Sequence, residues 1–398
     1  NGSDTFTILS TDSDGVPLSD TDTVAIAVGA VNDAPVNTVP GAQTVNEDTS
    51  LNITGVSVTD VDGNLATSQI SVGDGTLTVS LTGGATISAG ANGSSTLTLS
   101  GTETQINAAL ATISYQGDLN FNGADTFTIV STDSAGVPLS DTDTVTITVD
   151  PVNDAPVNTV PGAQTVDEDT SLNITGVSVT DVDGNLATTQ LSVTNGAITV
   201  SLAGGATISS GANGSGTLTL AGTEAQINTA LATISYQGDT NFNGADVLTV
   251  LSTDSAGVPL SDTDTVAITV SPVNDAPVNT VPGAQTVDED TALNITGVSV
   301  TDVDGNLATS QISVGDGTLT VSLAGGATIT AGANGSGTMT LSGTETQINA
   351  ALATISYQGD SNFNGSDTFT ILSTDSDGVP LSDTDTVAIA VGAVNDAP

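Results

Sequence analysis

The sequence lacks every basic side chain. Its 398 residues include 45 Asp plus Glu but no Lys, Arg or His, and the formal net charge at pH 7 is −45. Duplex nucleic acid and anionic membrane surfaces need basic side chains to neutralise phosphate, so we exclude both as direct partners. Without His, Cys or Lys there is also no Ser-His-Asp triad, thiolate, Schiff base or imidazole metal ligand. The remaining ligand chemistry is that of carboxylate, amide, hydroxyl and main-chain oxygens, which suits a hard cation.

Other absences narrow the class of protein further. There is no cysteine, so disulfides are excluded and stability must come from hydrophobic cores, bound ions or both. Aromatic residues make up 2% of the chain, too few for a carbohydrate-stacking platform, and we therefore expect no enzyme. No apolar run approaches the ~20 residues of a membrane span, and no basic-headed signal peptide is present. Because 37% of the residues are hydrophobic and many alternate with Thr, we predict a folded acidic protein.

The chain is a tandem array. Val-Asn-Asp-Ala-Pro occurs at 31–35, 152–156, 273–277 and 394–398, always 121 residues apart. We therefore predict three full repeats at 36–156, 157–277 and 278–398, preceded at 1–35 by the C-terminal part of another repeat. Residues 1–35 are identical to 364–398, and we expect the chain to be a segment of something longer. A period near 120 residues fits one independent domain per repeat better than one coil of a solenoid.

Most of the repeat alternates apolar and polar residues in the period of a β-strand. The segments with this pattern are 51–53, 56–58, 70–72, 77–81, 97–99, 126–130 and 144–149. Thr102 to Leu110 breaks it, because a Thr N-cap, a Gln at the capping-box position and apolar residues four apart indicate one or two helical turns. We predict an all-β fold of tandem immunoglobulin- or cadherin-like antiparallel β-sandwiches, each with one short helix. Tyr115 and Phe121 are expected to pack in or beside the core.

The acidic residues recur at fixed positions in each repeat. In Asp60-Val61-Asp62-Gly63, two carboxylates two residues apart on a turning backbone can converge on one ion. Asp118-Leu119-Asn120-Phe121-Asn122-Gly123 matches the first half of an EF-hand loop, but the twelfth position is Ile129 in a predicted strand, so we reject an EF-hand. Asp141 and Asp143 alternate with Thr on a strand face and are expected to be solvated surface, and Asp74 is expected to be a turn residue.

The arrangement resembles the cadherin-like repeats of giant bacterial surface adhesins, which are type I secreted, RTX or biofilm-type proteins. In that family the linker supplies Asn-Asp before Ala-Pro, the next domain supplies Asp-x-Asp and a later strand-end Asp, and the preceding domain supplies a Glu and an Asp-x-Glu. This chain departs from the pattern in two places. Asn120 stands where the family has Glu, and the leading linker residue Asp150 becomes Ser271 and Gly392. The metal ligands that the resemblance implies are Asn32, Asp33, Glu47, Asp60, Asp62, Asp118, Asp133, Asn153, Asp154, Glu168, Asp181, Asp183, Asp239, Asp254, Asn274, Asp275, Glu289, Asp302, Asp304, Asp360, Asp375, Asn395 and Asp396.

Calcium is the cation that these ligands favour. Carboxylates gathered at a linker repel each other by roughly 4 kcal/mol per pair at 4 Å, and no basic residue exists to relieve this. Oxygen-only ligation selects calcium over zinc or copper, and magnesium prefers to keep its waters. The alternative is that these Asp and Asn residues only form and cap turns.

We therefore expect an extracellular, secreted, calcium-rigidified spacer of a large cell-surface adhesin, in which calcium locks neighbouring repeats into a rod. Its expected partners are calcium, neighbouring repeats and other copies of the chain. One alternative is a segment of a self-assembling extracellular filament or sheath. Another is a module that binds glycans or a partner protein, which would need a surface loop that differs between repeats. The repeats differ mostly by small exchanges such as Thr82 for Ala203, which favours a spacer.

Overall fold

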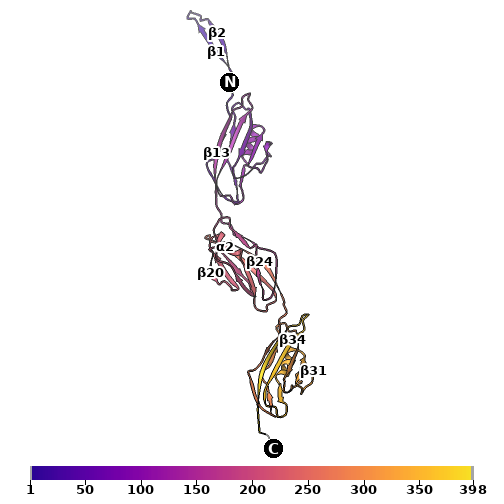
Figure 1. Cartoon of the computed structure of the whole chain (residues 1–398). Coiled ribbons are helices and arrows are strands. Elements are labelled where there is room, and N and C mark those ends of the chain that lie inside the picture. Colours follow the sequence, from indigo (N-terminus) through magenta and orange to yellow (C-terminus); the bar gives the residue numbers. More distant parts are fainter. Residues whose placement is uncertain (1, 396–398) are drawn as a thin grey trace. The chain divides into compact units, whose positions relative to one another are not determined.

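The structure is a computed structural model that describes residues 2–395. The chain divides into two units, Asn1–Asp154 and Ala155–Pro398, and each is described by itself. Figure 1 shows the sheets of both units, with β13 in the first and β24 and β34 in the second.

The first unit contains a separate hairpin and one β-sandwich. Its elements are β1 (Gly2–Thr11), β2 (Ser19–Val28), β3 (Val36–Thr38), β4 (Gln43–Asn46), β5 (Ser50–Asn52), β6 (Ser57–Thr59), β7 (Leu65–Ser71), β8 (Gly75–Thr78), β9 (Thr86–Gly90), β10 (Thr96–Ser100), α1 (Glu103–Leu110), β11 (Ser114–Gly117), β12 (Gly123–Asp133) and β13 (Ser140–Asp150). Strands β1 and β2 pair only with each other. One sheet of the sandwich has the order β4-β13-β12-β7-β10-β9, the other has the order β5-β11-β8, and β3 pairs with β6.

The second unit contains two more sandwiches of the same topology. The elements of the first are β14 (Val157–Thr159), β15 (Gln164–Asp167), β16 (Ser171–Asn173), β17 (Ser178–Thr180), β18 (Leu186–Ser192), β19 (Gly196–Thr199), β20 (Thr207–Gly211), β21 (Thr217–Ala221), α2 (Glu224–Leu231), β22 (Ser235–Gly238), β23 (Gly244–Asp254) and β24 (Ser261–Ser271). Those of the second are β25 (Val278–Thr280), β26 (Gln285–Asp288), β27 (Ala292–Asn294), β28 (Ser299–Thr301), β29 (Leu307–Ser313), β30 (Gly317–Thr320), β31 (Thr328–Gly332), β32 (Thr338–Ser342), α3 (Glu345–Leu352), β33 (Ser356–Gly359), β34 (Gly365–Asp375) and β35 (Ser382–Gly392).

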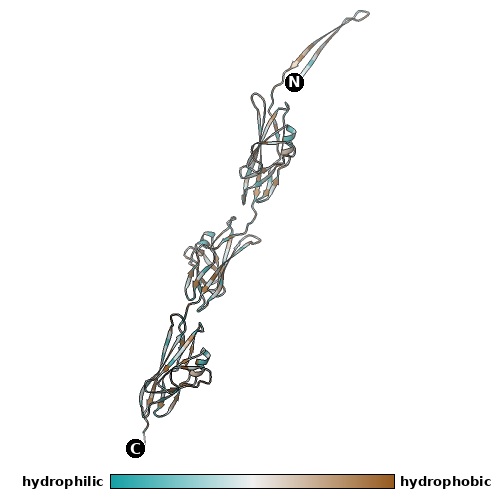
Figure 2. Cartoon of the chain, turned by 90° about the vertical axis from the view of Figure 1, so that its right-hand side faces the viewer, coloured by the Kyte–Doolittle hydropathy of each residue, from teal (hydrophilic) through white to brown (hydrophobic). Residues whose placement is uncertain are grey.

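The predicted fold class of tandem β-sandwiches with one short helix each is confirmed. In β13 the side chains of Val145, Ile147 and Val149 are buried while the Thr residues between them are exposed, as the alternation predicts. Figure 2 shows the same alternation of apolar and polar residues along the strands. Helix α1 begins after the N-cap Thr102, whose hydroxyl accepts the N–H of Gln105 in the predicted capping box.

Each sandwich has its own hydrophobic core, made by both sheets. In the first core, Ile70 and Phe127 of the large sheet and Leu77 and Tyr115 of the small sheet have no exposed surface. Tyr115 is thus in the core as predicted, and Phe121 is partly buried against it. A closed core in each repeat means that stability does not depend on a disulfide.

An edge strand that was not predicted pairs in parallel with the strand that leads into the linker. Strand β4 pairs in parallel with β13, and the N–H of Glu47, just after β4, donates to the carbonyl of Asp150 at 2.9 Å. The equivalent donors Glu168 and Glu289 reach the carbonyls of Ser271 and Gly392 at 2.9 and 2.8 Å. Because this contact uses only the main chain of the leading linker residue, it survives the change from Asp150 to Ser271 and Gly392.

A buried polar network fastens the chain just after the linker. The Asn279 side chain, 7% exposed, accepts a hydrogen bond from the Ser373 hydroxyl at 2.6 Å and donates to the carbonyl of Asp383 at 2.9 Å. Its own N–H donates to Oδ2 of Asp383 at 2.8 Å. The equivalent Asp141 is partly exposed, and its Oδ2 accepts the N–H of Asn37 at 2.8 Å, so this surface residue also holds the main chain. These contacts fix the start of β25, three residues after Asp275.

Changing Asn279→Ala is expected to lower the free energy of unfolding of this repeat by about 2–3 kcal/mol, because it removes the buried amide that pairs with the Ser373 hydroxyl and the Asp383 carbonyl, and leaves that hydroxyl with Ser310 alone. Hydrogen exchange of core amides in 278–392 measures the change. The control is Asn294→Ala at an exposed position at the end of β27, where we expect a change within about 0.5 kcal/mol. Equal losses in the two variants would contradict the anchoring role of Asn279.

Candidate metal centre

One acidic cluster lies wholly inside the second unit. The side chains of Glu168, Asp275 and Asp304 each bring a carboxylate oxygen to within 4.8 Å of the others. They come from the end of β15, from the linker before β25 and from the turn after β28. No Lys, Arg or His exists in the sequence to neutralise them.

Glu168 is fixed before any ligand arrives. Its side chain is 3% exposed, and Oε1 accepts the N–H of the linker residue Val273 at 2.6 Å. Its Oε2 accepts the side-chain amide of Asn243 at 3.2 Å. The carboxylate is therefore held at the linker by one donor from the linker itself and one from the turn after β22.

The linker residues are bound to the sandwich that follows them. The N–H of Asp275 donates to Oδ2 of Asp304 at 2.7 Å. The side-chain amide of Asn274 donates to Oδ2 of Asp375 at 2.8 Å, and its Oδ1 accepts the amide of Asn306 at 2.7 Å. The side chain of Asn274 thus bridges Asp375 and Asn306, and Asp275 is directed to the acidic cluster.

Oδ2 of Asp275 is buried and accepts no hydrogen bond. A buried carboxylate oxygen with no donor is costly, and it is more costly beside other carboxylates. Burial, followed by the charges of Asp304, Asp169, Glu168 and Asp302, raises the pKa of Asp275 above its ordinary value. The cluster therefore stores unfavourable electrostatic energy that a cation would relieve.

The Asp-x-Asp turn is built by local hydrogen bonds. Oδ1 of Asp302 accepts the N–H of Asp304 at 3.1 Å, and the carbonyl of Asp302 accepts the N–H of Gly305 at 3.1 Å. Gly305 has φ +68°, which favours glycine at this corner. Asp302 is 8% exposed, and burial is the main cause that raises its pKa. Its N–H donates to the carboxylate of Glu345 on α3 at 3.0 Å.

The surroundings of Asp375 lower its pKa, whereas those of Asp275 and Asp302 raise theirs. It lies at the end of β34, is 2% exposed and accepts the N–H groups of Asp377 and Leu381 at 3.1 and 3.0 Å. Burial opposes its ionisation, but the hydrogen bonds from Asn274, Asp377 and Leu381 together lower its pKa. Asp375 is therefore held as a carboxylate.

The first unit shows the same linker geometry after the hairpin. The side-chain amide of Asn32 donates to Asp133 at 2.8 Å and lowers the pKa of that carboxyl. The N–H of Asp33 donates to Oδ2 of Asp62 at 2.8 Å, and the amide of Asn64 donates to Oδ1 of Asn32 at 2.8 Å. Asp60 accepts the N–H of Asp62 at 3.0 Å.

Asp181, 121 residues before Asp302, has a similar environment in the second unit. It is 7% exposed, and its Oδ2 is buried without a hydrogen-bond partner. Burial is the main cause that raises its pKa, and the charges of Asp183 and Asp254 add to it. Asp254 is 2% exposed at the end of β23 and accepts the N–H of Leu260 at 3.1 Å.

The remaining candidate ligands either belong to the linker at the end of a unit or accept a hydrogen bond from it. Glu47 and Glu289 are buried and accept the N–H groups of Val152 and Val394, both at 2.5 Å. Asn153 and Asp154 close the first unit. Asn395 is exposed, and Asp396 lies outside the described residues.

Asp118, Asp239 and Asp360 are exposed in the turn after β11, β22 and β33. Their carbonyls accept the N–H of Phe121, Phe242 and Phe363 at 2.9–3.0 Å. Within residues 2–395, the cluster around Asp275 does not include the carboxylate of Asp239. The structure therefore gives these three residues a turn contact and does not bring Asp239 to the cluster.

Several residues of the site were not predicted. Asn243 holds Glu168, Asn306 holds Asn274, Glu345 holds the Asp302 main chain, and Asp169 lies close enough to raise the pKa of Asp275. Asp169 has φ +57°, and its Oδ1 accepts the N–H of Asn241 at 3.1 Å. The Glu-Asp pair near the start of each repeat was the available signal for Asp169. The contacts of the others join residues 32 to 75 positions apart, so local spacing could not reveal them.

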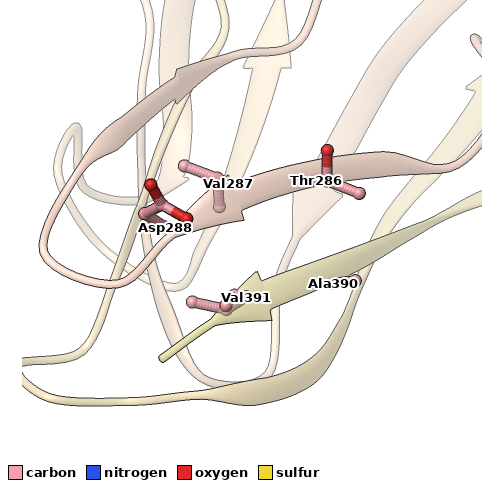
Figure 3. A pocket seen from close by; sticks show the side chains of 6 residues that line it. Thr286, Val287, Asp288, Ala390 and Val391 are labelled. Atoms are coloured by element: carbon pink, nitrogen blue, oxygen red, sulfur yellow. The ribbon is translucent and has the colours of Figure 1, made fainter. Parts of the chain in front are cut away.

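An open pocket elsewhere on the second unit has no cluster of acidic residues. Figure 3 shows it where β26 runs beside β35, lined by Thr286, Val287, Asp288, Ala390, Val391 and Gly392. Asp288 is the one acidic residue among them, and apolar side chains make up much of the rest. The pocket lacks a second charged group and is not a candidate for metal binding.

The cluster at Asp275 fits calcium by its chemistry. It offers carboxylate oxygens without nitrogen or sulfur ligands, and one of its buried oxygens has no donor. When bound, calcium would supply positive charge at this point. Glu168 is held for it by Val273 and Asn243, and Asp304 is held by the N–H of Asp275.

A model of the family described as the Protein GAMETE EXPRESSED 2 domain matches residues 40–141, 166–262 and 286–384. The three matches together cover more than half of the chain, which therefore belongs to this family. They fall one in each predicted repeat. No curated protein matches the chain.

Solved structures similar to this chain are extracellular cadherin domains. Domains 1–5 of protocadherin gamma B2 align with 16% identity and a TM-score of 0.40, over 99% of this chain and 67% of that chain. Human CDH23 EC21-23 aligns with 14% identity and a TM-score of 0.41, over 90% and 100%. Mouse cadherin-23 EC22-24 aligns with 17% identity and a TM-score of 0.32, over 91% and 99%. With scores this low, the assignment of the fold rests on the sheets described above.

Neither the family nor these structures are described as enzymes. The helices found in residues 2–395 are too short to cross a bilayer.

Proposed function

We propose that the chain is a calcium-rigidified spacer in an extracellular adhesion protein. The observation that carries the proposal is the buried Oδ2 of Asp275, which has no hydrogen-bond donor and lies in a cluster with Glu168 and Asp304. Ligands from the preceding sandwich, the linker and the following sandwich converge there. A cation held by all three would resist bending of the linker.

The same ligand types stand 121 residues earlier in the sequence, at Glu47, Asp154 and Asp183. We propose that calcium also binds in the first unit at Asn32 and Asp33, which contact Asp133 and Asp62. Each of 36–156, 157–277 and 278–398 is one domain in this proposal, because each of the three hydrophobic cores falls within one of these ranges. Calcium would align the domains as a rod.

The parent protein in this proposal is a giant bacterial surface adhesin, secreted and anchored outside the cell. Two features support it: near-identical repeats suit a spacer that adds length without new specificity, and high negative charge disfavours aggregation between such similar domains. Where calcium is scarce, repulsion between carboxylates would keep the linkers flexible. Where it is abundant, binding would stiffen them.

The test is isothermal titration of the whole chain with calcium chloride. We expect saturable binding with dissociation constants of about 10⁻⁴ to 10⁻³ M and weaker heats from magnesium chloride at equal concentration. A sodium chloride titration at matched ionic strength is the control for screening. Calcium heats no larger than those of the sodium control would exclude the proposal.

A further inference from the structure

An Asn-Gly pair lies beside the buried Glu of every repeat. The pairs stand at 122–123, 243–244 and 364–365, and the Gly of each is the first residue of β12, β23 or β34. The side-chain amide of each Asn donates to Oε2 of the buried Glu of its own repeat, and all three distances are 3.2 Å. The Asn that holds this Glu is therefore always followed by glycine.

An Asn-Gly pair can lose ammonia without an enzyme. The main-chain nitrogen of Gly244 attacks Cγ of Asn243, the new bond closes a five-membered ring, and Nδ2 leaves as ammonia with the proton that Gly244 gives up. Water then opens the ring. Cleavage at Cγ leaves Asp at position 243, and cleavage at the main-chain carbonyl leaves isoaspartate. Because the two reacting groups belong to neighbouring residues, water is the only co-reactant that the conversion needs.

The structure leaves Asn243 open to this reaction. Asn243 is exposed, and within the described residues its side-chain amide is held by one hydrogen bond, to Glu168. Gly244 has φ +130°, which favours glycine, so a side chain that would hinder the attack is disfavoured there. Gly244 is also the first residue of β23, and the ends of elements open most easily. Gly123 and Gly365 have similar φ angles of +134° and +147°.

Another Asn-Gly pair of the same repeat is fastened on both sides of its amide. Oδ1 of Asn213 accepts the N–H of Val200 at 2.8 Å, and Nδ2 donates to the carbonyl of Val200 at 2.9 Å. The N–H of Gly214, which would have to attack, donates to the carbonyl of Ile198 at 2.8 Å. The same contacts recur in the other two repeats. The chain therefore contains a matched comparison for Asn243.

We propose that Asn243, with its equivalents Asn122 and Asn364, is a site of spontaneous deamidation that makes the linker more dependent on calcium. Loss of the amide removes a donor from Oε2 of Glu168 and puts a carboxylate beside this buried carboxylate. Without calcium the new charge adds repulsion. With calcium it adds negative charge near the site, and the affinity of oxygen-ligand calcium sites rises with that charge. The calcium part of this inference rests on the proposed function, whereas the chemical conversion does not.

The conversion is tested on the full native chain, incubated at neutral pH and sampled over several weeks. Digestion at acidic residues and mass spectrometry of the peptides measure the loss of each amide. We expect Asn243 to deamidate at least about 10-fold faster than Asn213, because the second pair is held by the turn around it. In urea the two rates should become similar, since both are then flexible Asn-Gly pairs. A native rate at Asn243 no higher than that at Asn213 would overturn the proposal.

The consequence is tested with Asn243→Asp, which reproduces one product of the reaction. We expect a lower thermal midpoint than that of the parent chain in chelator, and at least about 3-fold tighter binding of one ion in titrations with calcium chloride. The matched control is Asn195→Asp, the same change in the same repeat, at a turn where the other repeats already have Asp74 and Asp316. Because Glu168 takes its amide donor from Asn243, the control should change the affinity by less than about 2-fold.

The outcomes separate this inference from the proposed function. If the parent chain binds calcium and Asn243→Asp binds it no more tightly than Asn195→Asp, the proposed function stands and the link between Asn243 and the linker is refuted. If neither the parent chain nor either variant binds calcium, the proposed function fails. Faster loss of the Asn243 amide and a lower midpoint of Asn243→Asp in chelator would still support the deamidation site in that case.

Discussion

Calcium at about 10 mM is expected to raise the thermal midpoint of the chain by roughly 5–15 °C over its value in chelator. With dissociation constants of about 10⁻⁴ to 10⁻³ M, this concentration stabilises the native state by about 1.4–2.7 kcal/mol per bound ion. The physical source is the neutralisation of carboxylates that no basic residue can pair with, including the donor-free oxygen of Asp275. Differential scanning calorimetry measures the midpoint.

Small-angle X-ray scattering of the same samples tests the mechanical part of the proposal. If calcium fixes the linkers, the maximum dimension should increase and vary less with temperature. Sodium chloride at equal ionic strength controls for screening, and magnesium controls for divalent charge. A midpoint and a maximum dimension that do not respond to calcium would leave the acidic residues as turn formers and solvated surface. The filament interpretation would then be preferred.

Changing Asp304→Asn is expected to weaken calcium binding at the linker around Asp275 by at least about 10-fold. The variant keeps the shape of the side chain and an oxygen that can accept the N–H of Asp275, but it removes one carboxylate from the cluster. Without calcium its stability should be equal to or higher than that of the parent chain, because a repulsive charge is gone. Hydrogen exchange of residues 273–277, with and without calcium, measures the local effect.

The matched control is Asp316→Asn, which makes the same chemical change at an exposed turn. The second repeat already has Asn195 at this position, so the residue is compatible with the fold. This variant should keep the full slowing of exchange by calcium. In both variants the linker at 152–156 provides an internal reference, since its sequence is unchanged. Retained slowing at 273–277 in the Asp304→Asn variant would count against Asp304 as a ligand.

Much of the fold follows from local patterns. The alternation in β13 fixes which residues face inward because neighbouring side chains of a strand point to opposite sides. The capping box at Thr102 and Gln105 fixes the start of α1 for a similarly local reason. The short strands β3, β4, β9 and β11 were missed, because three to five residues contain too little alternation to be distinguished from a loop. The parallel pairing of β4 with β13 joins segments about 100 residues apart and has no local signal.

The candidate site was likewise predicted only in part. The resemblance to cadherin-like repeats implied Glu168, Asp275 and Asp304 as ligands, and the structure brings them together. The same reasoning also selected Asp239, which is exposed, since a repeat pattern reports where a residue recurs but not where its side chain points. The partners that hold the ligands, such as Asn243 for Glu168, became visible only when distant turns were placed side by side.

The sequence by itself determined the fold class and limited the available ligand chemistry to oxygen donors. Composition limits what chemistry a chain can perform, and periodicity limits which face of a strand can be buried. Only the tertiary structure decided which carboxylate oxygen lacks a donor and which acidic side chains stay exposed. Asp275 has a buried oxygen without a donor, whereas Asp239 is exposed in a turn. Burial and hydrogen bonding depend on the neighbours a segment meets, and folding chooses those neighbours from far along the chain.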